Sequence, residues 1–353
     1  MPMYKNFLNR VSIKPIVYFH IGMPKTGTSA IQGFLDINRE ILASEKQCLY
    51  PNFRDADFTK GNSLNHGPFF LQAKKSNDFS DLNRQFTEAC LYCEKKGIPK
   101  MVISNEGFFW HWWPAFIKNL INITGVDYRI IIYLRRQDNF VAAGWKQWGH
   151  KISGINNIQE YAECTELDWH QVIQRWLKHF DQEKFIVKAY EKQQIGSDIV
   201  TDFISSIGIK NSDNFKKAPK TNGATNNGFS EDVVEIMKYS KELLKGENDN
   251  KLLDFMHMAL SEQYRKQPMQ DYDFLSPQER NAIIQKFEAS NAKLSEIFFS
   301  GKKIFNDPLP QEDQKWEASK PLTLERAIPI FIDILLTQGK QIRELRSELD
   351  NLK

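Results

Sequence analysis

Four short apolar runs, separated by segments with helical periodicity, constrain the fold of this chain more than any other feature of its sequence. They are Ile16–Ile21, Met101–Ser104, Tyr128–Leu134 and Phe185–Tyr190, and each is bounded by polar residues or glycine. Runs of this length and composition are typical of β-strands. Because strands that alternate with helices need crossover connections, the sequence predicts an α/β fold with a mostly parallel central sheet flanked by helices.

The segments between and after these runs carry helical signals. Asp168–Phe180 places its apolar side chains at helical spacing and predicts a core-facing helix, and Asp198–Ile207 predicts another. Ser230 is expected to cap the next helix, since two acidic residues follow it. The tail Leu324–Lys353 predicts a helix with apolar residues spaced by three and four. That helix either packs on its own domain or forms a coiled coil, through which the chain would be a homo-oligomer.

Composition and charge narrow the class of protein. The chain has 353 residues, of which 41% are apolar and 26% charged, as in globular proteins. Its 47 basic and 44 acidic residues give a net charge of only +3, and no long basic block suggests a nucleic-acid partner. Any anion site must therefore be local.

The cysteines and the apolar runs indicate in which cellular compartment the protein is expected. Cys48, Cys90, Cys93 and Cys164 are too few and too irregularly placed for a disulfide framework, so we expect reduced thiols. The Cys90–Cys93 pair has no second pair beside it, which favours a structural role over a metal site. We find no secretory signal and no apolar run long enough to span a membrane. The expectation is a soluble, cytoplasmic, bacterial protein without a metal.

The segment His20–Gln32, HIGMPKTGTSAIQ, carries the strongest chemical signal. Here the first apolar run breaks into a loop and a helix begins. Gly22 and Gly27 allow backbone torsions that larger residues resist, so successive amides can turn toward an anion. Thr28 and Ser29 fall where the new helix has unpaired N–H groups and its positive dipole end. The segment therefore predicts a phosphate or sulfate site.

The position of the lysine separates this loop from the Walker A motif. Walker A places lysine directly after the last glycine, whereas Lys25 precedes Gly27 by two positions. The order Pro-Lys-Thr-Gly-Thr-Ser resembles the 5′-phosphosulfate loop of the sulfotransferase superfamily. The resemblance implies the P-loop-NTPase-like fold of that superfamily, 3′-phosphoadenosine 5′-phosphosulfate (PAPS) as donor, its desulfated form PAP as product, and no metal requirement. It assigns donor binding to Pro24, Lys25, Thr26, Gly27, Thr28 and Ser29.

A second segment, Tyr128–Gln147, resembles the 3′-phosphate segment of the same superfamily. Arg135 closes the strand, where a guanidinium group suits phosphate oxygens. Ala143 takes the position that the superfamily fills with serine, and alanine cannot donate a hydroxyl hydrogen bond. Losing such a charged hydrogen bond, worth roughly 1.5–3 kcal/mol, weakens binding by about tenfold or more unless another group compensates. Arg136, Lys146 and the stretch Lys220-Thr221-Asn222 are candidates for that compensation.

A late polar stretch, Lys216–Ser230, resembles the superfamily loop that folds over the donor nucleotide. It adds Lys220 and Asn222 to the expected donor-binding residues. The resemblance covers residues 14–240 and is strongest to bacterial and glycan-modifying members, which share the Leu-Arg-Arg-Gln-Asp wording. We therefore expect a sulfotransferase domain over 1–320 and a helical tail over 321–353.

The resemblance also implies in-line sulfuryl transfer, in which placement and charge stabilisation dominate. Lys25 is expected to stabilise the negative charge of the leaving group. Two residues are candidates for the base that deprotonates the acceptor. His66 starts a predicted helix and titrates near neutrality, although it could be only a residue of the helix start. Glu106 closes the second strand and is the other candidate.

The acceptor is suggested by the aromatic segment Phe108–Phe116, FFWHWWPAF. Aromatic faces beside polar rims suit sugar rings, which favours a saccharide or glycan. The same residues could instead anchor a helix in the core. Two other functions stay open. One is a P-loop nucleotide kinase or NTPase, and the other is a catalytically decayed sulfotransferase-like binding scaffold, which Ala143 in place of serine would indicate.

Overall fold

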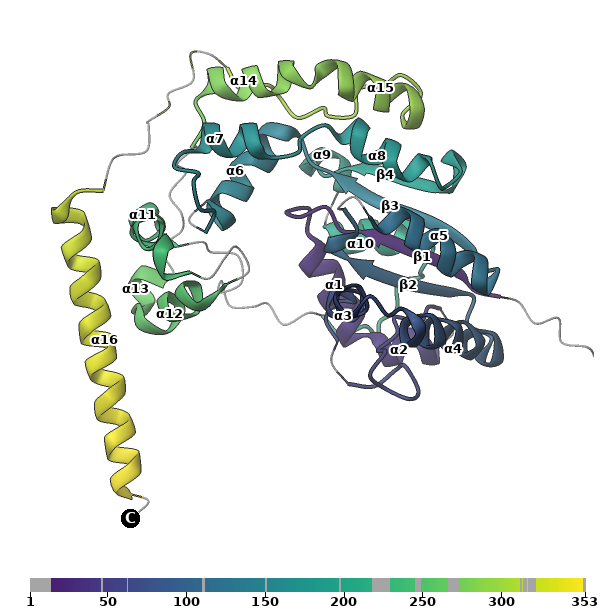
Figure 1. Cartoon of the computed structure of the whole chain (residues 1–353), viewed down its shortest axis with the longest axis horizontal. Coiled ribbons are helices and arrows are strands. Elements are labelled where there is room, and N and C mark those ends of the chain that lie inside the picture. Colours follow the sequence, from purple (N-terminus) through teal and green to yellow (C-terminus); the bar gives the residue numbers. More distant parts are fainter. Residues whose placement is uncertain are drawn as a thin grey trace, which may run out of the picture. The chain divides into compact units, whose positions relative to one another are not determined.

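The structure, a computed structural model, describes residues 14–351 except 46, 62, 110–111, 150, 197, 218–228, 245–248, 266–273, 312, 314–315 and 317–321. The chain divides into two compact units, whose elements are labelled in Figure 1. The first comprises the described residues of Met1–Arg135, Asp168–Ala218 and Ser290–Asp307. The second comprises those of Arg136–Leu167, Pro219–Ala289 and Pro308–Lys353.

The first unit is built on a four-stranded sheet in which every strand pair is parallel (Figure 1). The strands are β1 (Ile16–Ile21), β2 (Lys100–Asn105), β3 (Asp127–Leu134) and β4 (Phe185–Ala189), in the spatial order β2-β1-β3-β4. Their bounds fall within one residue of the four predicted runs. The predicted α/β class with a parallel sheet is therefore confirmed.

Helices cover both faces of this sheet. On one face Tyr18 belongs to a core cluster with Ile31 and Phe203, which come from α1 and α10. On the other face the ring of Phe19 stacks on Phe86 of α4. The helical elements of the unit are α1 (Thr28–Ile37), α2 (Arg39–Ser44), α3 (Gly67–Ser76), α4 (Ser80–Lys96), η1 (Glu106–Phe109), α5 (Trp113–Thr124), α8 (Trp169–Leu177), η2 (Gln182–Lys184), α9 (Lys192–Ile195), α10 (Ile199–Ser206) and most of α15 (Glu288–Phe298).

The described part of the second unit is helical. It contains α6 (Gln137–Trp148), α7 (Ile158–Cys164), α11 (Glu231–Tyr239), η3 (Lys241–Leu243), α12 (Lys251–Ala259), α13 (Glu262–Arg265), α14 (Pro277–Lys286) and α16 (Leu324–Asn351). The predicted cap of α11 is confirmed, because the Ser230 side chain accepts a hydrogen bond from the N–H of Val233. The predicted helical tail is confirmed as α16. Among the helices described, none combines the length and apolar character needed to cross a bilayer.

A buried ion cluster joins α6 to α14 in the second unit. Asp138 has no exposed side-chain surface and lies 2.7 Å from Arg136 and 2.6 Å from Arg280. Burial alone would raise the pKa of the Asp138 carboxyl, but the hydrogen bonds and charges of the two arginines outweigh it and hold that pKa below its usual range. Arg136 is thus committed to the packing of this unit.

A second buried charge, Arg39, organises the loop that leads from α2 to α3 in the first unit. Its guanidinium group donates hydrogen bonds to the carbonyls of Tyr50 at 2.7 Å, Gly61 at 2.7 Å and Ser63 at 3.0 Å. It also pairs with Asp36 at 2.7 Å, and its own side chain is only 1% exposed. One side chain therefore satisfies three carbonyls of a loop that has no regular structure of its own.

We expect Arg39→Ala to lower the free energy of unfolding by about 3–5 kcal/mol, because it leaves the Asp36 carboxylate without its ion-pair partner and three carbonyls without their hydrogen-bond donor. Urea denaturation measures the loss. Arg84→Ala is the matched control: Arg84 pairs with Asp81 and Glu88 but is 57% exposed, so we expect little or no change. Equal losses in the two variants would contradict the role given to Arg39.

Candidate active site

The predicted anion loop connects β1 to α1. β1 ends at Ile21 and α1 begins at Thr28. Gly27, the N-cap of α1, has φ 76° and makes no side-chain cap, and Lys25 also has a positive φ of 64°. A helix start without a side-chain cap leaves the N–H groups of its first turn available to a ligand. The loop therefore has the backbone form that an anion site requires.

Gly22 allows this loop to pass close to the end of β2. A Cβ atom at Gly22 would lie 3.0 Å from both Cα and Cγ of Glu106 and 3.1 Å from Cγ2 of Thr28. The N–H of Gly22 donates to the carbonyl of Asn105 at 3.3 Å. Any larger residue would push the loop away from Glu106, so the glycine sets the distance between the two strand ends.

The other loop side chains divide into braces and exposed groups. Thr26 is fully buried, and its hydroxyl donates to the carbonyl of Met23 at 2.6 Å. Pro24 is also buried. Thr28 is 3% exposed and its hydroxyl donates to the Glu106 carboxylate, whereas Ser29 is exposed. Thr26 and Pro24 thus shape the loop, while Ser29 faces outward.

Three charged residues from three strand ends gather around the loop. Arg135, just after β3, donates from Nη1 to the carbonyl of Lys25 at 2.7 Å. Its guanidinium lies 5.6 Å from the centroid of the Tyr190 ring, and its carbonyl accepts from Trp169 Nε1 at 2.8 Å. Burial lowers the pKa of Lys25, the charge of Arg135 lowers it further, and the carboxylate of Glu106 opposes both. The structure thus brings together the predicted Lys25, Glu106 and Arg135.

His66 lies at the N-terminal end of α3 and is 1% exposed. Its Nε2 is 2.8 Å from the carbonyl of Pro51, and its Nδ1 accepts from the N–H of Ser104 at 3.0 Å. Burial lowers the pKa of His66 to about 4, although the hydrogen bond to Pro51 acts in the opposite direction. Both ring nitrogens are therefore used in holding the loop to β2.

Behind the loop lies a buried polar network, in which the roles of Ser104 and Gln32 were not identified from the sequence. The hydroxyl of Ser104 lies 2.8 Å from Nδ1 of His20 and accepts from Nε2 of Gln32 at 3.0 Å. It joins β1, β2 and α1. Burial lowers the pKa of His20 to about 3, so the ring is neutral and braces the strand ends. The only sequence signal was the presence of polar residues within otherwise apolar strands.

The remaining predicted donor residues are not brought to this cluster by the described contacts. Ala143 lies in α6, in the second unit, and is half-buried. Arg136, a proposed substitute for the missing serine, pairs with Asp138. Lys220 and Asn222 lie outside the described residues.

The aromatic segment is divided between core and surface. Phe108 and Phe109 are at most 1% exposed and Trp113 is 4% exposed, so these rings belong to the core. Trp112 is 50% exposed. Trp110 and His111 lie outside the described residues. Among the residues that are described, no three His, Cys, Asp or Glu side chains are close enough to hold a metal ion.

Comparisons with known proteins give limited likenesses. No protein-family model matches the sequence. An uncharacterised protein of Archaeoglobus fulgidus is 25% identical over 180 residues, which is 50% of this chain and 47% of that protein. The chain thus spans about half the length of this relative.

Three solved sulfotransferase structures are similar in part. A sulfotransferase from Alicyclobacillus acidocaldarius has 16% identity and a TM-score of 0.33, covering 56% of this chain and 82% of its own. The sulfotransferase domain of the curacin biosynthetic pathway has 12% identity and a TM-score of 0.35, and the match covers 78% of this chain and 98% of that domain. The sulfotransferase domain of the Synechococcus PCC 7002 olefin synthase has 10% identity and a TM-score of 0.35, and the match covers 78% of this chain and 95% of that domain. TM-scores of this size do not indicate a function.

We expect Glu106→Gln to lower the pKa of Lys25 further, because it removes a negative charge that opposes burial and Arg135. A pH titration of the Lys25 side-chain signal by NMR, in protein labelled on lysine, measures the shift. Glu40→Gln is the control, since Glu40 is exposed on α2. An unchanged or raised Lys25 pKa in Glu106→Gln would show that the carboxylate does not act on this lysine.

Proposed function

We propose that this protein is a sulfotransferase that moves a sulfuryl group from PAPS to a hydroxyl or amine acceptor. The observation that carries the proposal is the loop Pro24–Ser29, in which Lys25 adopts a positive φ beside an uncapped helix start. Backbone N–H groups, a lysine and an arginine converge there, which suits a doubly anionic group. A loop with the order Pro-Lys-Thr-Gly-Thr-Ser resembles the donor loop of sulfotransferases.

The residues of the loop fit the 5′-phosphosulfate part of the donor. In the proposal, Lys25, the exposed Ser29 and the amides that begin α1 hold this group. The cradle depends on Gly22 and Gly27, because a Cβ atom at Gly27 would lie 3.0 Å from Ile199. Arg135 is the proposed ligand of the 3′-phosphate. Ala143 has no hydroxyl group to offer, so we propose that Lys220 and Asn222 add to the affinity for the nucleotide.

In the proposed reaction, side chains of the protein stabilise the charge of the leaving group and accept the proton of the acceptor. The donor supplies the sulfuryl group, which forms a bond to the acceptor oxygen or nitrogen as its bond to the leaving phosphate breaks. Lys25 stabilises the negative charge on the leaving phosphate. Glu106 accepts the acceptor proton, and the Thr28 hydroxyl that donates to this carboxylate fixes its orientation. His66 serves as a brace in this scheme.

We propose a saccharide as the class of acceptor. The support is Trp112, which precedes α5 and leaves half of its side chain exposed. An amphipathic aromatic ring at the surface suits the face of a sugar ring. Phe108, Phe109 and Trp113, which lie close to it in the sequence, are anchored in the core.

Binding of PAP separates a sulfotransferase from a nucleotide kinase. We expect calorimetry to detect PAP binding without metal and to find weaker binding of ATP with magnesium. Lys25→Ala should weaken PAP binding at least tenfold, because a charge-assisted hydrogen bond is worth roughly 1.5–3 kcal/mol. Lys75→Ala, at an exposed position of α3, is the control. Equal PAP affinity in Lys25→Ala and the parent protein would overturn the role of the loop.

Turnover distinguishes the two candidate bases. With radiolabelled donor and a glycan mixture, Glu106→Gln should lower transfer by about 10²–10⁴-fold while PAP affinity changes little. His66→Ala should lower the melting temperature, since it leaves the Ser104 N–H and the Pro51 carbonyl without their partner. Its folded fraction should keep its turnover. The reverse pattern, with His66→Ala inactive and Glu106→Gln active, would identify His66 as the base. Absence of transfer in the parent protein, with PAP bound, would favour the binding scaffold.

A further inference from the structure

One face of α16 carries an apolar stripe that no described part of its own unit covers. Its positions are spaced by four and three residues, the heptad spacing of coiled coils. Seven of the eight are large apolar residues, each between 46% and 74% exposed, and the eighth is glutamine. We call this stripe the α16 seam: Leu324, Ile328, Phe331, Leu335, Gln338, Ile342, Leu345 and Leu349.

A different face of α16 packs on its own unit. Ala327 and Ile330 are 4% and 1% exposed and belong to the core cluster with Val233 of α11 and Met256 of α12. Gln341 donates from Nε2 to the carbonyl of Met258 at 2.9 Å. Beyond it, every residue from 342 to 351 is exposed. A short helical stretch with no packed face is marginal in water, so the seam and the last turns of α16 require another partner.

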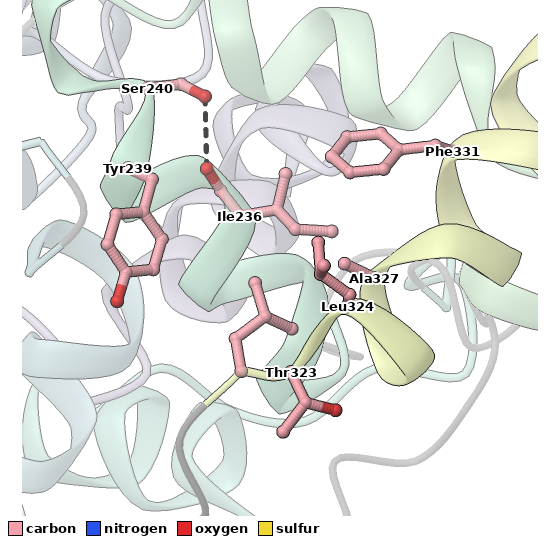
Figure 2. A pocket seen from close by; sticks show the side chains of 8 residues that line it. Ile236, Tyr239, Ser240, Thr323, Leu324, Ala327 and Phe331 are labelled. Carbon is pink, nitrogen blue, oxygen red and sulfur yellow. Dashed lines mark hydrogen bonds between the residues drawn. The ribbon is translucent and has the colours of Figure 1, made fainter.

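The seam begins at an apolar pocket, shown in Figure 2. The pocket has a volume of about 290 Å³ and lies between α11 and α16. Leu324 and Phe331 of the seam line one side, and Ile236 and Tyr239 of α11 line the other. The pocket is thus continuous with the seam and deepens the surface that a partner would fill.

We propose that the partner is a second copy of this chain, whose α16 lies antiparallel along the seam. In this register Leu324 faces Leu349 of the second copy, and Ile328 faces its Leu345. Phe331 faces its Ile342, and Leu335 faces its Gln338. Every layer except those containing Gln338 is then fully apolar, and the end of each α16 covers the pocket of the other copy.

Charge and shape favour the antiparallel arrangement. Residues that flank the seam at equivalent positions face one another in an antiparallel pair, which places Glu325 of each copy beside Arg346 of the other. By symmetry this opposite-charge contact occurs twice. Ile332, 50% exposed, then faces Gly339, a residue that is unfavourable inside a helix unless close packing needs it. In a parallel pair Glu325 and Arg346 are three heptads apart and do not meet.

Light scattering after gel filtration tests whether the dimer exists. We expect a particle of twice the 41.2 kDa chain mass. Leu335→Glu should give a monomer with unchanged circular dichroism, because Leu335 is 70% exposed and outside the unit's own core. Lys340→Glu introduces the same group on an exposed position of α16 outside the seam and should leave the dimer intact. A monomeric parent protein at micromolar concentration, or a dimeric Leu335→Glu variant, would overturn the proposal.

Charge exchange tests the register. Glu325→Arg and Arg346→Glu should each weaken dimerisation about tenfold in sedimentation equilibrium. The double variant should return to within about threefold of the parent, because the opposite-charge contact is restored. A double variant as weak as the single variants would contradict the antiparallel register.

Cysteine cross-linking tests the orientation without relying on charge. Cys164 is the exposed native thiol of the four, so the background is Cys164→Ser. A mixture of Ile328→Cys and Leu345→Cys chains should form a disulfide-linked dimer on oxidation, since these positions face each other only in the antiparallel pair. Each variant alone should not. Cross-linking of either variant alone indicates a parallel pair and overturns the proposed orientation.

Discussion

The contact between the β1–α1 loop and the end of β2 sets the geometry on which the rest of the site depends. Gly22 leaves room for the loop beside Glu106, where a Cβ atom would be too close, and the Thr28 hydroxyl donates to the Glu106 carboxylate. Arg135 ties the same loop to the end of β3 through the carbonyl of Lys25. A parallel sheet places the ends of these strands at one edge, and this is where such folds bind ligands.

Positive charge exceeds negative charge among Lys25, Arg135 and Glu106 at this edge of the sheet. Lys25 and Arg135 are both half-buried cations, and the carboxylate of Glu106 raises the pKa of Lys25 against the effects of Arg135 and of burial. Because the two cations disfavour each other, the loop is stabilised by an anion bound beside them. The neutral network of His20, Ser104 and Gln32 supports the strands without adding charge. In the proposed function, a local site of this kind would allow a chain of net charge +3 to bind a polyanionic nucleotide.

Much of this fold follows from local sequence. The four strands and the helix-start loop were predicted within a residue or two, because apolar runs and glycine positions act locally. The state of His66 could not be predicted, since it depends on a loop that Arg39 holds from a distance in sequence. The tail shows the same limit. Its heptad spacing was visible from Ile342 onward, but only burial separates the face that packs on α11 and α12 from the seam that reaches back to Leu324.

The decisive experiment is a crystal structure of the protein with PAP bound. We expect the 5′-phosphate of PAP at the start of α1, within hydrogen-bonding distance of Lys25 Nζ and of the amides of Thr28 and Ser29. PAP bound elsewhere, or bound with Lys25 turned away from its phosphates, would rule out the proposed donor site.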